Sequence, residues 1–392
     1  MKLLVVGGKL QGTEACYLAA EAGFETVLVD RREAPPAAGL ADRQVVTDVT
    51  ADEGLTRALV RSCDAVLPAC EDLATLEWLA DRVPSWDVPL LFDLDAYRVT
   101  ASKLASRRLF DELGVPLPRP WPACGLPAVV KPDSASGSEG VSVAWDEAGV
   151  AEAVAALRSA GHEPLVEEYV PGASLSLEVL CWEGRAVPLQ VTGLEFDESY
   201  DCKRVVAPVE HAASGVLSSF DAISVRLAEG LGLRGLMDVE VMIADDGPRV
   251  LEIDARLPSQ TPTAVLGSSG LNLLAALADT VRDGRLPPVD RSAREACVYQ
   301  HVVARDGTLR VVGEHVMGAA RPLARVPGFF GVDEALTDYR PGAPSWAATL
   351  IAHGATVSDT RRRTDEAVRA MAAHEGLRLE PRPQTTTPGG GR

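Results

Sequence analysis

Hydrophobic and polar residues recur with two different periods along the first hundred positions. Short apolar runs, which are typical of buried strands, occupy 2–8, 25–30 and 64–70. The segment 13–24 between the first two runs has its apolar residues at helical spacing. Because strands that alternate with helices predict a parallel sheet, we expect residues 1–95 to form an open parallel α/β domain.

Further along the chain, alternation with a period of two replaces this mixed pattern. Residues 174–196 and 234–257 each alternate apolar and polar positions on both sides of a turn that contains glycine. This pattern indicates two β-hairpins. Amphipathic helices are predicted at 102–114, 150–161 and 220–233 from apolar residues at helical spacing.

Two pairs of acids lie within the second hairpin. Asp238 and Glu240 alternate on its first strand, and Glu252 and Asp254 alternate on its second strand. Alternate residues of a strand share a face, and pairing across the hairpin brings the two pairs onto one face. Like charges this close repel, and burying them is unfavourable without a partner. Converging carboxylates are typical of a Mg²⁺ site, whereas a solvent-facing strand surface with scattered acids is the alternative.

The chain of 392 residues is acidic, with a formal net charge of −18. This charge argues against nucleic acid as a partner. No apolar run approaches the ~20 residues that span a bilayer, and the first residues lack a signal-peptide cleavage pattern. We therefore expect a cytoplasmic protein without a membrane partner. The seven cysteines form no Cys-x-x-Cys pair, which favours reduced thiols and no zinc site.

Lysine is rare among the 38 basic residues. The chain contains five lysines, and arginine fills the other basic positions. Such a bias marks the remaining lysines as candidates for positions where a compact ammonium group is needed. The five are Lys2, Lys9, Lys103, Lys131 and Lys203, and all except Lys2 lie in segments that other features also mark as functional.

Lys131 ends an apolar strand and is followed by a loop rich in Ser and Gly, "KPDSASGSEG" (131–140). Small residues allow backbone N–H groups to approach phosphate oxygens, although this loop does not match the P-loop pattern. In "LVEEYVPG" (165–172), Glu167 and the backbone that follows have the acceptor and donor groups that an adenine ring needs. These segments together favour a nucleotide-binding protein.

The order of these motifs resembles the ATP-grasp superfamily. Lys103 and Lys131 with its Ser/Gly loop come first, and "VEEYV" and the carboxylate hairpin follow, in the order and spacing of that superfamily. The resemblance covers nearly the whole chain. It implies a ligase that phosphorylates a carboxylate with ATP, after which an amine attacks the acyl phosphate to form a carbon–nitrogen bond.

The same resemblance implies the domain organisation. We expect an α/β and α+β architecture, in which an open parallel pre-ATP-grasp domain precedes a two-lobed ATP-grasp fold. The expected segments are the pre-ATP-grasp domain at 1–95, the small lobe with the phosphate loop at 96–175, the large lobe with the C-terminal region at 176–380, and a disordered tail at 381–392.

Five segments carry a closer similarity to the ligases of pyrrolysine biosynthesis: "GGKLQG", "FDLDAYRVT", "YDCKRV", "RGLMDVE" and "EIDARLPSQTPTAVLGSSGLNLL". This similarity implies the substrates. The carboxylate of 3-methyl-D-ornithine would be activated, and the ε-amine of L-lysine would attack it to give an isopeptide, ADP and phosphate. The wider superfamily usually has Asn where Asp254 stands, and the Asp matches this branch.

The resemblance also implies which residues bind ATP and two Mg²⁺ ions, for which Mn²⁺ is a substitute. Lys103 and Lys131 would hold the phosphates. The loop residues that would close over the triphosphate are Ser134, Ser136, Gly137, Ser138 and Gly140, and those that would bracket the adenine are Glu167, Glu168 and Val170. The metal ligands would be Glu240, Glu252 and Asp254. Arg256 and Lys131 would be catalytic, and Arg256 would stabilise the tetrahedral oxyanion.

Small-molecule amino acid substrates are the implied partners. Cationic diamino acids need acids around them, and their carboxylates need hydrogen-bond donors. The acids implied by position are Glu71, Glu178, Asp201 and Asp238. The other residues expected to contact the substrates are Lys9, Leu10, Gln11, Tyr200, Ser259, Gln260 and Thr261. The resemblance is also compatible with a homodimer.

Other functions are weighed against this one. A ligase that joins a different amino acid pair would keep every motif. A non-catalytic nucleotide sensor on the same scaffold would have no need for the carboxylate trio and both lysines. A biotin-dependent carboxylase would need a bicarbonate site and a carrier partner, and the sequence has no biotinyl-lysine segment.

Overall fold

The computed structural model describes residues 1–134, 137–210 and 213–380. Its N-terminal strands form a parallel sheet in the order β3-β2-β1-β4, which confirms the predicted α/β domain. The strands are β1 (Lys2–Val6), β2 (Glu25–Asp30), β3 (Arg43–Val46) and β4 (Ala65–Pro68), and the helices are α1 (Leu10–Glu21), α2 (Glu53–Arg61) and α3 (Leu73–Arg82). The turn between β1 and α1 places the start of α1 at the carboxyl edge of this sheet.

A larger sheet carries most of the remaining chain. Its main path runs antiparallel in the order β12-β11-β8-β9-β10-β13-β17-β16-β15, and β14 and β18 pair beside it. Both predicted hairpins, β8–β9 and β11–β12, are confirmed. The strands are β8 (Ala173–Trp182), β9 (Arg185–Phe196), β10 (Cys202–Ala207), β11 (Gly235–Ala244), β12 (Gly247–Asp254), β13 (Ala296–Arg305), β14 (Thr308–Val311), β15 (Ala324–Pro327), β16 (Glu334–Thr337), β17 (Ser345–Gly354) and β18 (Arg378–Leu379).

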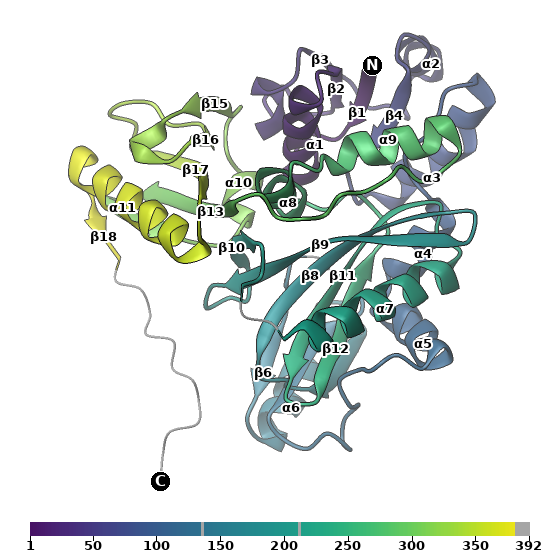
Figure 1. Ribbon diagram of the computed structural model, residues 1–392, viewed down its shortest axis with the longest axis vertical. Helices are drawn as coiled ribbons and strands as arrows, with labels where there is room; N and C mark the ends of the chain where they lie inside the picture. The colour runs from purple at the N-terminus through teal and green to yellow at the C-terminus, as the bar shows by residue number, and fades with distance from the viewer. Residues whose placement is uncertain (135–136, 211–212, 381–392) are drawn as a thin grey trace.

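A small third sheet lies at one end of the large sheet, at the bottom of Figure 1. Its strands run antiparallel in the order β6-β5-β7, and α6 packs on it through Val150 and Leu157. The elements are β5 (Ala128–Pro132), β6 (Ser142–Ala144), β7 (Pro164–Glu168) and α6 (Glu147–Ser159). This sheet presents Lys131 at the end of β5 toward the acid-bearing hairpin of the large sheet.

Helices cover the sheets and join them. Helix α7 packs on β8 and β9, and α11 packs on β13 and β17. The helices not yet introduced are α4 (Leu94–Thr100), α5 (Lys103–Leu113), α7 (Ser214–Leu231), α8 (Thr261–Ser269), α9 (Leu273–Asp283), α10 (His315–Gly318) and α11 (Val357–Glu375), with short 3₁₀ helices at η1 (Pro36–Gly39), η2 (Val83–Trp86) and η3 (Phe329–Gly331).

The N-terminal domain packs directly against α8 and α9 (Figure 1). Two polar contacts fix this packing. The backbone N–H of Thr263 on α8 donates to the Glu14 carboxyl of α1 (2.7 Å), and the Asn272 side chain donates to the carbonyl of Leu18 (2.7 Å). One apolar core therefore continues from α1 through α8 and α9 to the large sheet, and the carboxyl edge of the parallel sheet faces the large sheet.

Within the described ranges, no single helix is long and apolar enough to cross a membrane, and α8 with α9 meets the length and composition test only as a pair bent by 94°.

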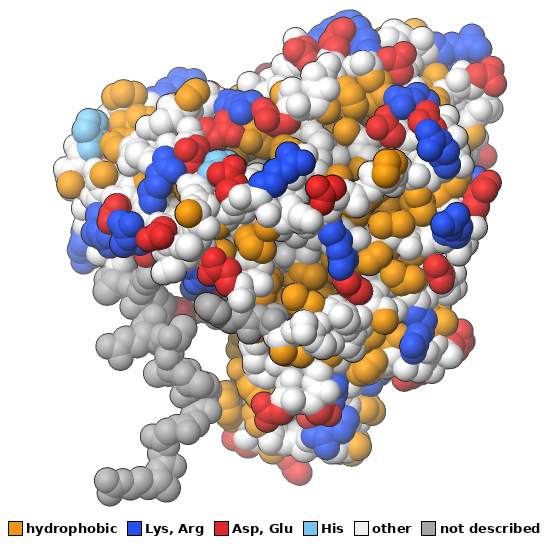
Figure 2. Space-filling model, viewed as in Figure 1, with side chains coloured by type: hydrophobic (Ala, Val, Ile, Leu, Met, Phe, Trp, Pro, Cys, Tyr) orange, Lys and Arg blue, Asp and Glu red, His pale blue; other side chains and the backbone are white. Residues whose placement is uncertain are grey.

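Acidic and basic side chains are interspersed over the face shown in Figure 2. That face has no continuous basic surface of the kind that nucleic acid binding requires. The predicted disordered tail, 381–392, lies outside the described residues.

Candidate active site

The acids of the second hairpin lie side by side, as the sequence predicts. Asp238 is opposite Asp254, and Glu240 is opposite Glu252, in the antiparallel pairing of β11 with β12. On the other side of β11, Glu178 of β8 is opposite Asp238. We call these five residues the acid ladder. Because cross-strand neighbours share a face of the sheet, the ladder gathers five carboxyl groups on one surface.

A β-bulge interrupts the hairpin next to the ladder. The register shifts between Glu240 and Val241, which leaves Leu251 as an extra residue on β12. The carbonyl of Leu251 accepts a long hydrogen bond from Lys131 Nζ (3.4 Å). The bulge thereby gives the small sheet a contact with the large one at the acid ladder, which alternation in the sequence did not predict.

Burial and mutual repulsion raise the pKa values of the ladder. Burial, with the charge of Glu252 next in importance, raises the pKa of Glu240 to about 8. Burial and Asp254 hold the pKa of Asp238 well above its usual range, and burial raises that of Asp254 to about 6 against the opposing effect of Arg256. The site therefore has more carboxyl groups than its own bases neutralise, and a bound cation would lower all three values.

Several ladder oxygens have no hydrogen-bond partner among the described residues: Oδ1 of Asp238, Oδ1 of Asp254 and both oxygens of Glu178. Hard oxygen donors in this number suit Mg²⁺. Among the described residues, no three acidic, His or Cys side chains already converge as a metal cluster. Glu252 and Asp254 each pair with a base. A divalent ion at Glu240, Glu252 and Asp254 would replace these two bases.

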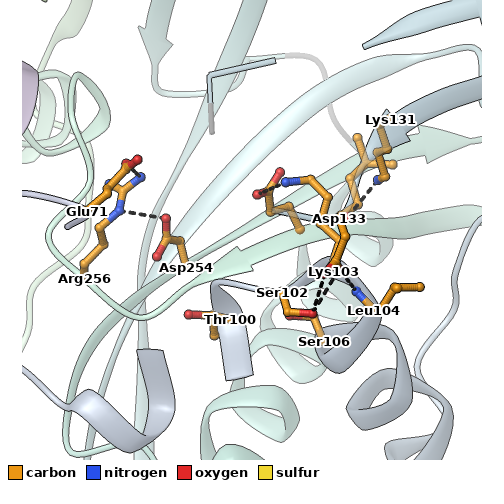
Figure 3. Close-up of polar contacts among 12 residues, drawn as sticks. Glu71, Thr100, Ser102, Lys103, Leu104, Ser106, Lys131, Asp133, Asp254 and Arg256 are labelled. Carbon is orange, nitrogen blue, oxygen red and sulfur yellow. Dashed lines mark hydrogen bonds and ion pairs between the residues drawn. The ribbon is translucent and has the colours of Figure 1, made fainter. Parts of the chain in front are cut away.

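Lys103 is anchored beside the ladder at the start of α5. Its ammonium lies 2.7 Å from Glu252 Oε1, and its side chain is almost fully buried. Ser102 caps the helix, and Asp133 accepts hydrogen bonds from the Ser102 hydroxyl (2.9 Å) and the Leu104 N–H (2.7 Å). Figure 3 shows this anchor beside Lys103 and Lys131. Because Asp133 follows β5, the same contact fixes both predicted phosphate-binding lysines relative to each other.

Lys131 and Glu167 form a buried pair across the small sheet, with Nζ 2.6 Å from Oε1. Arg107 of α5 holds the other carboxylate oxygen of Glu167 at 3.1 Å. Glu167 thus serves as counter-ion to two bases. Its predicted contact with adenine stays a prediction, and so do those of Glu168, which pairs with Arg119 (2.7 Å), and of the buried Val170.

The predicted phosphate loop is described except for two residues, so Ser136 lies outside the described residues. Ser134 is the second residue after the end of β5. Gly137 and Gly140 adopt left-handed backbone (φ 61° and 75°), as does Ser138 (φ 60°). A side chain at Gly137 would also come within 2.8 Å of the His315 ring. Gly137 is therefore needed both for its backbone conformation and for close approach to His315.

Arg256 links the ladder to the N-terminal domain. Its Nε lies 2.7 Å from Asp254, and its terminal nitrogen lies 2.9 Å from Glu71 in the loop after β4 (Figure 3). Gln11 at the start of α1 also donates to Glu71 (3.2 Å). Charge balance thus fixes the Arg256 guanidinium at the boundary between the two domains.

Two cavities meet at Arg256. A cleft of about 790 Å³ is lined by the β1–α1 turn, including Lys9, Leu10 and Gln11, and by Glu71. A cavity of about 120 Å³ is lined by the acid ladder's Asp238, Glu240, Glu252 and Asp254, together with Ser259, Gln260 and Thr261. The structure therefore brings together most of the predicted substrate residues around two adjoining spaces.

A family model described as an ATP-grasp domain matches residues 100–260. The 3-methyl-D-ornithine–L-lysine ligase of Methanosarcina barkeri (strain Fusaro / DSM 804) is 38% identical over 318 residues, which are 80% of this chain and 83% of that enzyme. The chain belongs to the 3-methyl-D-ornithine–L-lysine ligase family. The enzyme of the same description from Methanosarcina acetivorans is 35% identical over 320 residues, again 80% of this chain and 83% of its own.

The structural comparison confirms the ATP-grasp fold. An N5-carboxyaminoimidazole ribonucleotide synthetase, solved as its ADP complex, aligns with a TM-score of 0.71 at 16% identity and covers 96% of this chain and 98% of its own. A biotin carboxylase from Campylobacter jejuni aligns with a TM-score of 0.70 at 12% identity, with 96% of this chain and 95% of its own covered. At these identities the likeness shows the architecture alone.

In this member of the ligase family, two predicted substrate residues lie elsewhere than in the cavity walls. Tyr200 lies on an exposed turn, and the lining described for the two cavities does not include it. Glu178 is fully buried at the far end of the acid ladder, where burial raises its pKa to about 7. Their contacts with substrate stay predictions.

Asp201 lines the small cavity, and its carboxylate is engaged with the segment before α10. It accepts from the backbone N–H groups of Glu314 (3.1 Å) and His315 (3.2 Å), and from His315 Nδ1 (2.7 Å). Asp201 thus positions Glu314 and His315, two residues that sequence reasoning missed. The segment "GEHVMG" (313–318) could have indicated them, because it has an acid and a histidine between two glycines in an otherwise apolar stretch.

Gln260 has a strained backbone at the start of α8, with φ 74° and ψ −58°. Its side-chain oxygen contacts Nε2 of the buried His301 (3.2 Å), and His301 Nδ1 contacts the Thr349 hydroxyl (2.9 Å). Burial lowers the pKa of His301 to about 4, so this histidine is neutral. Strain of this kind is kept where a side chain must be held in one place.

Proposed function

We propose that this chain is an ATP-dependent ligase that joins the carboxylate of 3-methyl-D-ornithine to the ε-amine of L-lysine, with ADP and phosphate as the other products. The proposal rests on the similarity to relatives described as 3-methyl-D-ornithine–L-lysine ligases, which extends over 80% of this chain. The acid ladder, which lies between Lys103 and Arg256, supports it.

ATP would bind between the small sheet and the acid ladder. Lys103 and Lys131 would hold its phosphates, and Glu167 and the backbone as far as Val170 would bracket its adenine. The described loop residues that would cover the triphosphate are Ser134, Gly137, Ser138 and Gly140. The ADP complexes of neighbouring folds support a nucleotide here.

Two Mg²⁺ ions, or Mn²⁺ in their place, would be held by Glu240, Glu252 and Asp254. The unpartnered Oδ1 of Asp254 and the raised pKa of Glu240 support a cation at this position. Bound metal neutralises charge on a transferring phosphoryl group. Lys103, which now neutralises Glu252, would then be available to the phosphates.

The two cavities suit two cationic substrates. The small cavity, with Asp238 and the donors of Ser259 and Thr261, would take the diamino acid that is activated. The larger cleft would take L-lysine between the β1–α1 turn and Glu71. Arg256 lies where the two meet, and its guanidinium would stabilise the oxyanion formed when the amine attacks. We also propose that the protein forms a homodimer.

The test measures ADP release in a coupled assay with Mg·ATP, D-ornithine and L-lysine, each omitted in turn, followed by mass spectrometry of the product. D-Ornithine lacks only the 3-methyl group. We expect ADP release to require both amino acids, and a product with their summed mass less one water. The Glu252→Gln variant provides the background from contaminating ATPases.

Other results of this assay would identify one of the alternative functions. ADP release with a different amino acid pair identifies a ligase of another pathway and refutes the proposed substrates. Nucleotide binding without ADP release for any amino acid refutes the enzyme and identifies a nucleotide sensor.

A further inference from the structure

Glu314 lies where the two cavities meet. Its side chain lines both the cleft of about 790 Å³ and the cavity of about 120 Å³. The other residues described as lining both spaces are Gly137, Arg256 and Ser259, so Glu314 supplies the carboxylate at this boundary. It comes from the segment between β14 and α10, and it lines the small cavity together with acids of the ladder.

The position of Glu314 is fixed from both sides. The Ser259 hydroxyl donates to its Oε2 (2.7 Å). Asp201 accepts from its backbone N–H, and Asp197 accepts from the N–H of Gly313 (2.9 Å). One hydrogen bond therefore holds the carboxylate and two hold the backbone beside it, and a side chain held in this way is typical of a functional group.

Several of the other carboxylates of the site pair with bases, whereas among the described residues Glu314, like Asp238 and Glu240, does not. Glu252 pairs with Lys103, and Glu71 and Asp254 pair with Arg256, whereas within the described ranges Glu314 forms no ion pair. Burial raises the pKa of Glu314, and the Ser259 hydroxyl offsets part of this effect. The titratable and charged groups that face it are Glu14, Asp201, Cys202, Glu240, Arg256, Tyr299 and His315.

Ligation needs a base at this boundary. The ε-amine of free lysine is an ammonium ion at neutral pH, with a pKa of about 10.4, and an ammonium ion is no nucleophile. The carboxylates of the ladder are assigned to metal and to the activated substrate. A carboxylate between the space for the amine and the space for the acyl phosphate has the geometry of a general base.

We propose that Glu314 is the general base that takes a proton from the attacking amine. This inference rests on the proposed function. Glu314 accepts one proton from the ε-ammonium, and the neutral nitrogen attacks the carbonyl carbon of the acyl phosphate. The C–N bond forms and the C–O bond to phosphate breaks, with its electron pair leaving on phosphate. The second N–H proton passes to the phosphate, so the products are the amide, HPO₄²⁻ and protonated Glu314.

The test separates activation from amine attack in the Glu314→Gln variant. Hydroxylamine is neutral at pH 7 and traps an acyl phosphate as a hydroxamate without a base. With Mg·ATP and D-ornithine, we expect hydroxamate formation by Glu314→Gln to stay within about threefold of the wild type. With L-lysine, we expect kcat for ligation to fall by about 10²–10⁴-fold, the usual contribution of a general base.

Two further variants complete the design. Glu314→Asp keeps a carboxylate one methylene farther back, and we expect it to recover part of the ligation rate. Glu152→Gln makes the same chemical change at an exposed position on α6 that is not among the residues lining either cavity, and should match the wild type. Ligation by Glu314→Gln should also rise steeply between pH 7 and 9.5, since the free amine must then come from solution.

The results that overturn the inference are distinct from those that overturn the proposed function. A Glu314→Gln variant that ligates lysine at the wild-type rate refutes the base, and so does one that loses hydroxamate and isopeptide formation equally. If the wild type ligates a different amine, the proposed substrates are wrong and the same comparison is made with that amine. A wild type that ligates nothing refutes both.

Discussion

Mg²⁺ binding to this protein should strengthen with pH because of Glu240. The side chain belongs to the acid ladder, where burial and the neighbouring charge of Glu252 raise its pKa to about 8. A carboxyl group must lose its proton before it binds a metal ion, so proton and metal compete for Glu240. At neutral pH the Glu240 carboxyl group is therefore protonated in most molecules.

The magnitude follows from the pKa. With a value of about 8, roughly one tenth of Glu240 is ionised at pH 7, so the apparent affinity is about tenfold below that of the ionised site. At pH 9 the carboxyl is about nine tenths ionised. The apparent affinity for Mg²⁺ should therefore rise about tenfold from pH 7 to pH 9, and binding at pH 7 should release about 0.9 proton.

Titration calorimetry of the nucleotide-free protein measures both quantities. Affinities are recorded at pH 7, 8 and 9, and proton release is obtained from buffers of different ionisation enthalpy. Asp238→Asn is the matched control, since it removes a neighbouring buried acid that is not among the proposed ligands and should leave the slope in place. Glu240→Gln should bind weakly with no slope. A wild-type affinity that is flat from pH 7 to 9 refutes the reasoning.

Three other substitutions have definite expected outcomes. Glu252→Gln should lower turnover at least about 100-fold without unfolding the protein, because the amide still accepts a hydrogen bond from Lys103 but is a poor metal ligand. ADP release measures the turnover and a melting curve checks the fold. Full turnover would contradict the metal assignment. Glu167→Gln should lower the free energy of unfolding by about 3–5 kcal/mol, since Lys131 and Arg107 lose their buried counter-charge; denaturant unfolding measures this, and an unchanged midpoint contradicts it. Burial raises the pKa of Glu14 from 4.5 to about 7, so the folded state keeps this proton longer than the unfolded state and stability falls as pH rises from 4.5 to 7. Glu14→Gln should therefore melt higher than the wild type at pH 8, with a smaller difference at pH 5, and equal differences at both pH values exclude this explanation.

The acid ladder shows how much of the site could be predicted from the sequence. Alternation puts Asp238 with Glu240, and Glu252 with Asp254, on one face of each strand, and the short turn makes the two strands partners. Both relations are local, so the sequence is sufficient to predict them. The bulge at Leu251 was not predictable, because alternation carries no signal for a single extra residue.

The contacts between distant segments required the fold. Arg256 pairs with Glu71 across 185 positions only because α8 and α9 seat the N-terminal domain on the large sheet. Asp201 was predicted to contact substrate, and the structure shows it holding Glu314 and His315. The sequence does not show whether a carboxylate faces a ligand or a backbone N–H. Only the positions of its neighbours in the fold distinguish these two roles.

The sequence by itself determined the elements and the chemistry: a parallel α/β domain, two hairpins, a Ser/Gly loop after Lys131 and a set of acids suited to a metal ion. These follow from periodicity and side-chain type, which act over a few residues. The tertiary structure alone decided which charges are already paired, which are left unpartnered, and that Glu314 stands between two cavities. Pairing and burial depend on the packing of segments that are distant in the chain, and this packing sets the charge balance of the site.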